Sequence, residues 1–316
     1  MYRKSIFIFV LCMSVVTLLT SCTMNSKDVQ LVYDAKAGVG EGAMWDYKNN
    51  RLLWTDISGK KFFVYYPETS DMFSYQLPQE IGTVVPMDSN MVVMALANGI
   101  FTFSFDTKEL KAQVLPDIDT ARVRFNDGAC APDGSLWLGT MDYNVTEPIA
   151  SLYKVGPGFS ISKKMDSVTV SNGISWSLDG SKMYYIDSPT YSVVQFDYDT
   201  VRADISHKTK IISTPKRWGT PDGSTLDEEG MLWIAHWGGG IVSRWNPETG
   251  TLLDTLVVPA PNVTSVAFGG KDKDLLFITT ARNWMQPGDE DKYPLAGGLF
   301  VAKPGVRGID ACYFRP

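Results

Sequence analysis

Pro132-Asp133-Gly134-Ser135-Leu136-Trp137-Leu138-Gly139-Thr140 is a turn followed by a short apolar run, and this unit decides the fold. The Asp-Gly pair favours a turn, and the run that follows is typical of a buried β-strand. Comparable runs elsewhere in the chain are LLWTD from Leu52, VVMAL from Val92, MYYID from Met183, LWIAH from Leu232 and LFITT from Leu276. The unit therefore recurs every 40 to 49 residues.

Each apolar run is followed by a turn and a second strand-like segment. These second segments are residues 61–66, 99–105, 150–155, 192–198, 240–245 and 297–301. Four short strands in a period of this length are typical of propeller blades, so we predict an all-β, six-bladed β-propeller with four-stranded antiparallel blades over residues 31–316. A strand at Val29–Tyr33 would join the first and last blades. A β-sandwich is the alternative, but six near-equal repeats exceed what one sandwich needs.

Two segments interrupt the period. Residues 201–219 are expected to form a long connection. Residues 281–294 form a polar insertion that contains Trp284, and we expect it to overhang the central channel.

The N-terminus has the pattern of an export signal. Arg3 and Lys4 precede an apolar run over residues 6–19, which ends in Leu-Thr-Ser before Cys22. This pattern predicts a lipoprotein signal peptide over residues 1–21 and a lipidated tether over residues 22–30, anchored at Cys22. The protein would then lie in a bacterial cell envelope, periplasmic or associated with the outer membrane, and touch the membrane only through its anchor. The alternative is an ordinary cleaved signal with an incidental cysteine.

Composition excludes several functions. The 29 lysines and arginines face 35 aspartates and glutamates, a net charge of -6, which leaves no basic stripe for nucleic acid. Only two histidines occur, so a three-histidine zinc site cannot form. Beyond the leader, Cys130 and Cys312 either pair as a disulfide or remain free thiols. We expect a monomer.

Oxygen-bearing side chains recur 10 or 11 positions before the apolar runs, where the innermost strand of a blade should begin. They are Glu41, Asn126, Asn172 and Asp222, and the second and sixth repeats lack them. Any one alone would be an ordinary turn residue. Equivalent positions in a closed propeller converge on the axis, and the two carboxylates match the charge of a divalent cation. All-oxygen ligation favours calcium first, then magnesium or manganese, and carboxylate sites also accept zinc.

Three further kinds of residue are candidates for substrate contact. Arg124 lies two positions before Asn126, so it shares a strand face with it, and the alternative role is an inter-blade salt bridge. His236 lies in the strand-like Trp-Ile-Ala-His-Trp and is either a packed histidine or a proton-transferring substrate contact. Aromatic side chains that would line a sugar site, or belong to the core, are Tyr143, Trp237 and Trp284.

These motifs together resemble the family of gluconolactonase, senescence marker protein (regucalcin) and luciferin-regenerating enzyme. The motifs are Gly40-Glu41-Gly42, Arg124-Phe125-Asn126-Asp127-Gly128, Gly139-Thr140-Met141, Ser171-Asn172-Gly173, Pro221-Asp222-Gly223 and Pro294-Leu295-Ala296-Gly297-Gly298. The resemblance runs from Tyr33 to the C-terminus. It implies a six-bladed propeller that hydrolyses sugar lactones with one divalent metal ion. It further implies that Glu41, Asn172 and Asp222 bind the metal, that Asp222 acts as the base, and that Arg124 and Asn126 contact substrate.

One position departs from the family pattern. Some relatives carry a substrate-binding glutamate three residues after the Gly-Thr-Met motif, where this chain has Asn144. We expect Asn144 to bind substrate hydroxyls, with a different sugar preference. A phosphotriesterase or esterase of the same fold, and a sugar- or calcium-binding propeller without turnover, are the alternatives.

Overall fold

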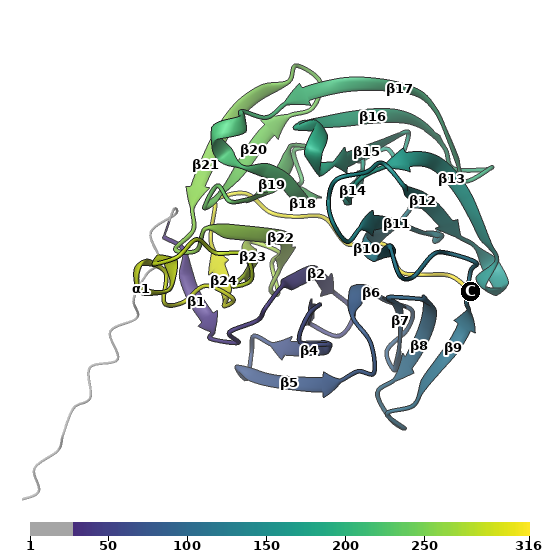
Figure 1. Ribbon diagram of the computed structural model, residues 1–316, viewed down its shortest axis with the longest axis horizontal. Coiled ribbons are helices and arrows are strands. Elements are labelled where there is room, and N and C mark those ends of the chain that lie inside the picture. The colour runs from purple at the N-terminus through teal and green to yellow at the C-terminus, as the bar shows by residue number, and fades with distance from the viewer. Residues whose placement is uncertain (1–27) are drawn as a thin grey trace, which may run out of the picture.

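Twenty-four β-strands, which form six four-stranded sheets around a central axis, make up most of the computed structural model (Figure 1). The structure describes residues 28–316. The predicted six-bladed propeller is confirmed, and each sheet is antiparallel. The signal peptide predicted over residues 1–21 and the anchor at Cys22 lie outside the described residues and stay predictions.

Each of the first five blades runs in chain order from the strand beside the axis to the outermost strand. Blades 1 to 3 are β2 (Gly40–Asp46), β3 (Arg51–Asp56), β4 (Lys61–Tyr66), β5 (Asp71–Gln76); β6 (Ile81–Pro86), β7 (Met91–Leu96), β8 (Gly99–Ser104), β9 (Leu110–Val114); β10 (Val123–Cys130), β11 (Leu136–Asp142), β12 (Ala150–Val155), β13 (Ile161–Val168). Blades 4 and 5 are β14 (Ser171–Trp176), β15 (Lys182–Asp187), β16 (Ser192–Asp199), β17 (Asp204–Ser213); β18 (Thr220–Leu226), β19 (Leu232–Trp237), β20 (Ile241–Asn246), β21 (Thr251–Val257).

Blade 6 closes the ring with strands from both ends of the chain. Its strands, from the axis outward, are β22 (Asn262–Gly269), β23 (Leu275–Ala281), β24 (Leu299–Ala302) and β1 (Gln30–Tyr33). Antiparallel pairing of β1 with β24 satisfies an edge that would otherwise expose unpaired backbone groups. This is the closing strand expected from the sequence.

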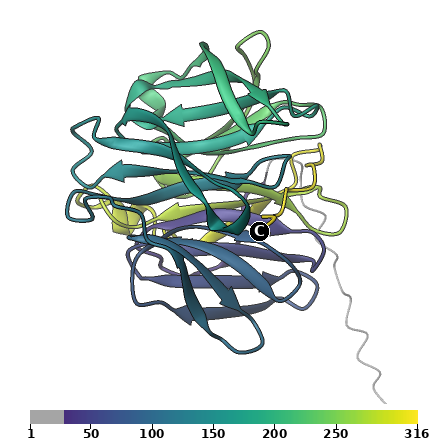
Figure 2. The ribbon, with the colours of Figure 1, turned by 90° about the vertical axis from the view of Figure 1, so that its right-hand side faces the viewer.

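Burial follows position in the blade. Every residue of β3 is buried, whereas β5 at the outer edge alternates between exposed and half-buried residues. Neighbouring blades share apolar clusters, as where Leu53 and Phe62 of blade 1 pack with Val84 and Val92 of blade 2. The side view shows the blades stacked against one another in this way (Figure 2). Packing between blades therefore holds the inner strands in place.

The long connection expected over residues 201–219 is wrong, because ten of its residues form β17. Most of its side chains are polar and exposed, and its three isoleucines do not form an alternating pattern, so the apolar signal of a strand is missing. The remaining regular elements are a four-residue helix and three single turns of 3₁₀ helix. They are α1 (Asp289–Lys292), η1 (Pro157–Phe159), η2 (Ser188–Thr190) and η3 (Lys216–Trp218). Within residues 28–316, no helix is long and apolar enough to cross a membrane.

A shift in register recurs in all six inner strands. In β2 it lies between Glu41 and Met44, and in β14 between Asn172 and Ile174. The other four inner strands carry the same irregularity against their neighbours. Such bulges twist a strand and redirect its side chains, which turns these positions toward the axis.

Candidate active site

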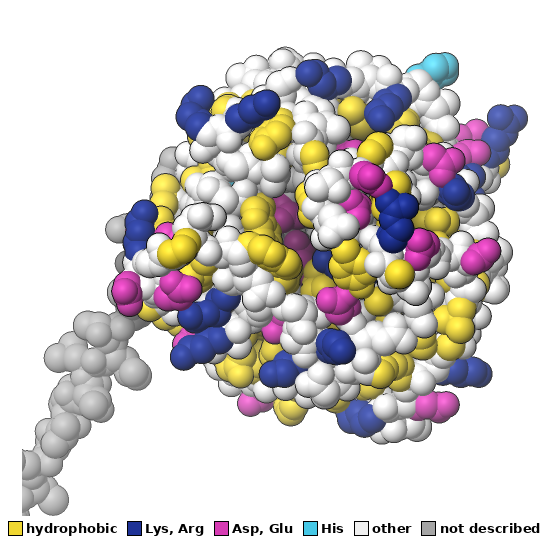
Figure 3. Space-filling view, viewed as in Figure 1, with side chains coloured by type: hydrophobic (Ala, Val, Ile, Leu, Met, Phe, Trp, Pro, Cys, Tyr) yellow, Lys and Arg dark blue, Asp and Glu magenta, His cyan; other side chains and the backbone are white. Residues whose placement is uncertain are grey.

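The four side chains that the repeat placed in phase meet in one cavity at the axis. Glu41, Asn126, Asn172 and Asp222 come from β2, β10, β14 and β18, and all four line a cavity of about 390 Å³. They are only 6%, 5%, 4% and 4% exposed. The space-filling view shows a hollow in the middle of one face, with acidic and hydrophobic side chains in and around it (Figure 3).

Glycine at the equivalent position of blade 2 lets the inner strands approach closely. A Cβ on Gly82 would lie 2.4 Å from the backbone oxygen of Asn126. Any side chain at this position would therefore displace the strand that carries Asn126.

Glu41 and Asp222 are a buried pair of carboxyl groups. Burial raises the pKa of Glu41 to about 8 and the pKa of Asp222 well above its usual value, and their mutual repulsion adds to the shift of Asp222. The backbone N–H of Gly42 donates to Glu41 Oε2 over 2.8 Å. Asp222 Oδ1 is buried and has no hydrogen-bond partner within the described part of the chain. The pair therefore has a buried oxygen that can accept a ligand or a proton.

The two amides are held by a short chain of hydrogen bonds. Asn126 Nδ2 donates to Asn172 Oδ1 over 2.8 Å and to the backbone oxygen of Ser171 over 2.9 Å. Asn172 Nδ2 donates to Ser188 Oγ over 2.9 Å. Since a carbonyl oxygen has two lone pairs, Asn172 Oδ1 can accept Asn126 and still face a ligand.

Arg124 forms an ion pair between blades and also lines the cavity. Its Nη1 donates to Asn126 Oδ1 over 2.7 Å, and its Nε lies 3.9 Å from Glu80 Oε2 on the neighbouring blade. Tyr143 donates from its hydroxyl to the same Glu80 oxygen over 2.7 Å. The guanidinium is 7% exposed and lines the cavity, so it is both paired and available.

Two acidic residues of the site were missed by the sequence analysis. Glu80 lies just before β6 and belongs to no motif, so no sequence signal marks it. Asp127 stands beside Asn126 in a motif that was noted, and its charge raises the pKa of both Glu41 and Asp222. Burial raises the pKa of Asp127 itself to about 6. The bulge in β10 brings Asp127 near Glu41 and Asp222. A strand whose side chains strictly alternate between two faces would place Asp127 on the face opposite Asn126, so the sequence pattern does not predict this position.

The mouth of the cavity is formed by a loop after β11 and by two tryptophans. The loop supplies Tyr143, Asn144 and Val145, so Asn144 lies where a substrate contact was predicted. Asp142 holds this loop, because its carboxylate accepts the backbone N–H groups of residues 144, 146 and 147 over 3.1, 2.9 and 3.0 Å. Across the mouth lie Trp237 of β19 and Trp284 of the insertion.

His236 does not fit the predicted substrate contact. It is fully buried and is not among the cavity-lining residues, because alternation along β19 turns it away from the face that Trp237 presents. Its Nε2 lies 2.7 Å from Ser243 Oγ, and its ring meets the edge of Trp218. Burial lowers its pKa to about 4, so the ring is neutral at physiological pH. His236 therefore corresponds to the alternative given from the sequence, a histidine packed in the core.

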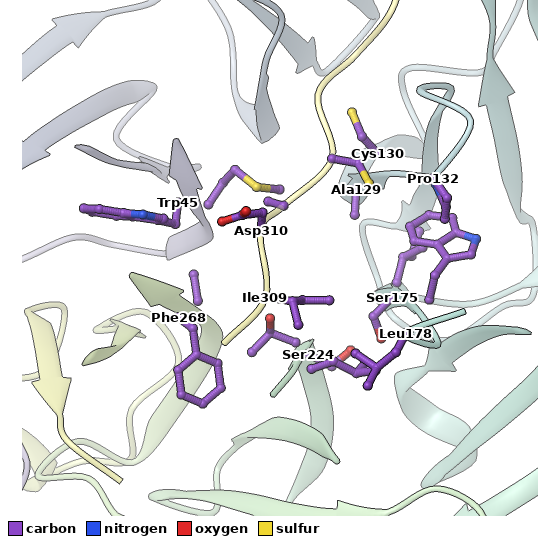
Figure 4. Close-up of a pocket in the computed structure, with 18 of the residues that line it drawn as sticks. Trp45, Ala129, Cys130, Pro132, Ser175, Leu178, Ser224, Phe268, Ile309 and Asp310 are labelled. Atoms are coloured by element: carbon purple, nitrogen blue, oxygen red, sulfur yellow. The ribbon is translucent and has the colours of Figure 1, made fainter. Parts of the chain in front are cut away.

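A second cavity lies at the opposite end of the channel. It has about 410 Å³ and is lined mainly by apolar side chains from the far ends of the inner strands (Figure 4). Residues 309–312 of the C-terminal segment form part of its wall. Cys130 and Cys312 both line it and are free thiols in this structure. Its two acidic lining residues are Asp179, in the turn after β14, and Asp310 of the C-terminal segment.

Comparison with known proteins gives the same picture along most of the chain. The sequence profile of the SMP-30/Gluconolactonase/LRE-like region matches residues 39–282. A Bacillus subtilis (strain 168) protein named "Putative sugar lactone lactonase YvrE" is 35% identical over 276 residues, which is 87% of this chain and 94% of that protein. Regucalcin of Oryctolagus cuniculus is 35% identical over 292 residues, 90% of this chain and 98% of its own. The structure of a luciferin-regenerating enzyme superposes with a TM-score of 0.85 at 30% identity, covering 92% of this chain and 99% of that one.

Proposed function

Since the chain belongs to the SMP-30/gluconolactonase/LRE-like family, we propose that it is a metal-dependent hydrolase that opens sugar lactones. Family membership supports the lactonase activity, and the relative from Bacillus subtilis carries that activity in its name. The geometry of the cavity supports the metal dependence and the roles of individual residues.

The observation that carries the proposal is the buried pair of Glu41 and Asp222. Burying two charged carboxyl groups away from water costs folding free energy unless a positive charge compensates them. Arg124 is the one cation lining the cavity among the described residues, and it is already paired with Glu80. Asp222 Oδ1 is buried with no hydrogen-bond partner in the described part of the chain, which fits an oxygen that binds a metal ion.

The donor set indicates a hard ion. Within the described chain, no cluster of three or more histidine, cysteine, aspartate or glutamate side chains could hold a metal, so an amide oxygen must complete the set. Glu41, Asp222 and Asn172 supply only oxygen, which favours calcium and permits magnesium, manganese or zinc.

A divalent cation bound by these three residues would polarise the lactone carbonyl and stabilise charge that develops on its oxygen. Arg124 and Asn126 would orient the ring oxygens of the substrate, so that attack at the carbonyl carbon is close to intramolecular. Asp222 would accept the proton of the attacking water and return it to the ring oxygen as the ester bond breaks. The product is a single open-chain hydroxy acid, because the alcohol that leaves the carbonyl carbon remains part of the same molecule.

A pH-stat assay with a panel of aldonolactones, with and without chelator, tests the proposal. We expect acid release that the chelator abolishes and that calcium or another divalent ion restores. Hydrolysis of phosphotriesters in place of lactones would assign the related esterase activity. Binding of a sugar or calcium with no turnover of any ester would make the chain a binding protein.

A further inference from the structure

A cluster of exposed apolar side chains surrounds the mouth of the active-site cavity. Tyr143, Val145 and Trp284 are 39%, 49% and 71% exposed, and all three line the same cavity as the buried carboxyl groups. Exposed apolar groups gathered at a cavity mouth indicate a binding surface rather than a random feature of the surface. The proposed lactone chemistry at the floor does not use Val145 or Trp284, and it uses only the hydroxyl of Tyr143, through Glu80.

Trp284 is held in place despite its exposure. Its neighbour Asn283 is fixed on three sides: its backbone N–H donates to the oxygen of Gly38, its backbone oxygen accepts Asn262 Nδ2, and its side chain donates to Ser58 Oγ. The backbone of Trp284 has a φ of 59°, a left-handed conformation that is unfavourable for a bulky residue. Such a conformation persists only where the surroundings enforce it, and it recurs at functional sites.

Trp284 forms an angled pair of rings with Trp237. Their centroids lie 5.8 Å apart at 56°, and Trp237 is anchored against the small apolar cluster of Val39, Ile57 and Ala281. The pair is a preformed apolar cradle, which lowers the ordering cost of binding. A ring with apolar faces and a polar edge can pack against such a pair.

The outer part of the cavity is uncharged. Among the described residues, the ionisable side chains that line the whole cavity are Glu41, Arg124 and Asp222, which are at most 7% exposed and therefore lie at the floor. The more exposed polar lining residues are Asn144, an amide, and Thr220, a hydroxyl, whereas Ser188 is buried beside Asn172. A neutral group with hydroxyls suits this surface, whereas a phosphate or a carboxylate would lack a cationic partner.

From these observations, and resting on the lactonase function proposed above, we infer that the mouth is a second sugar subsite. A lactone at the floor would place its attached substituent at the mouth, because the carboxyl groups are buried and Trp284 is 71% exposed. The substrate class is thus a disaccharide-derived aldonolactone, whose neutral second pyranose ring packs on Trp284 and Trp237.

The test compares two lactones in wild-type protein and in Trp284→Ala, both loaded with metal. The ratio of kcat/KM for cellobionolactone or maltobionolactone to kcat/KM for gluconolactone should fall about three- to tenfold in the variant, the value expected for one lost ring contact. Trp284→Phe should recover most of that ratio. Phe73→Ala, which removes an aromatic residue 50% exposed on the outer strand β5, is the matched control and should leave the ratio unchanged.

A binding measurement separates this inference from the lactonase proposal. Calorimetric titration with maltitol, a neutral disaccharide alcohol that cannot react, should show binding to wild-type protein and at least threefold weaker binding to Trp284→Ala. Maltitol binding without turnover of any lactone would support the subsite and refute the lactonase. An unchanged ratio, no maltitol binding, or an equal loss with a long-chain alkyl lactone would overturn the subsite.

Discussion

Replacing Asp222 by Asn removes one charge from the buried pair and keeps the shape of the side chain. Metal-free Asp222→Asn should be more stable than metal-free wild-type protein, because the folded protein no longer has to keep a carboxyl group protonated, or bury its charge, next to Glu41. Removing uncompensated buried charge stabilises proteins by about 1 kcal/mol or more, so we expect the metal-free melting temperature to rise by roughly 2 to 4 °C.

Asp222→Asn should raise the stability of the metal-free protein but reduce the stabilisation that metal binding gives. An ion present at a hundred times its dissociation constant stabilises the folded state by about 2.7 kcal/mol, or roughly 5 to 10 °C for a domain of this size. Wild-type protein should show this shift with calcium, and the variant should show little of it and lose about a thousandfold in kcat/KM. Asp71→Asn, the same change at an exposed position of β5, is the control and should behave as wild type.

The pH dependence of stability gives a further check on the same residues. Burial raises the pKa of Glu41 from 4.5 to about 8, and Asp222 is shifted in the same direction. The folded metal-free protein therefore holds more protons than the unfolded chain between these pH values, so its stability falls as pH rises, by about 1.4 kcal/mol per pH unit for each proton. The fall in stability per pH unit should be smaller in Asp222→Asn, because this variant has one titrating carboxyl group fewer. A wild-type melting temperature that is flat between pH 5 and 8, or a variant that still shifts fully with calcium, would refute the reasoning.

Two other changes test how the site is held together. Tyr143→Phe removes the hydrogen bond to Glu80 and so weakens the contact that holds Arg124. KM for lactones should rise about fivefold, equivalent to roughly 1 kcal/mol, and kcat should stay within about twofold. A selective loss of kcat would contradict this positioning role. Asp142→Ala removes the acceptor of three backbone N–H groups, so hydrogen exchange at residues 144, 146 and 147 should become about tenfold faster; unchanged exchange would mean that other contacts hold the loop. Those bonds also lower the pKa of Asp142, so the wild-type loop should stay anchored until the pH falls below the usual aspartate value of 3.8.

The amino-acid sequence by itself determined the architecture and the floor of the site. Buried second strands must be apolar, and their recurrence every 40 to 49 residues sets the number of blades. Rotational symmetry then brings residues at equivalent repeat positions together at the axis, which is why Glu41, Asn126, Asn172 and Asp222 could be grouped without coordinates. The strand β17 was not predicted from the sequence, because an outermost strand faces water and needs no apolar pattern.

Only the tertiary structure decided what surrounds that floor. The bulge in β10 brings the charge of Asp127 to the carboxyl pair, and packing between blades sets Glu80 beside Arg124. The alternation of β19 turns His236 into the core while Trp237 faces the cavity. Trp284 meets Trp237 across a long separation in the chain. Contacts of this kind depend on backbone irregularities and on the docking of one blade against the next, and neither leaves a periodic signal in the sequence.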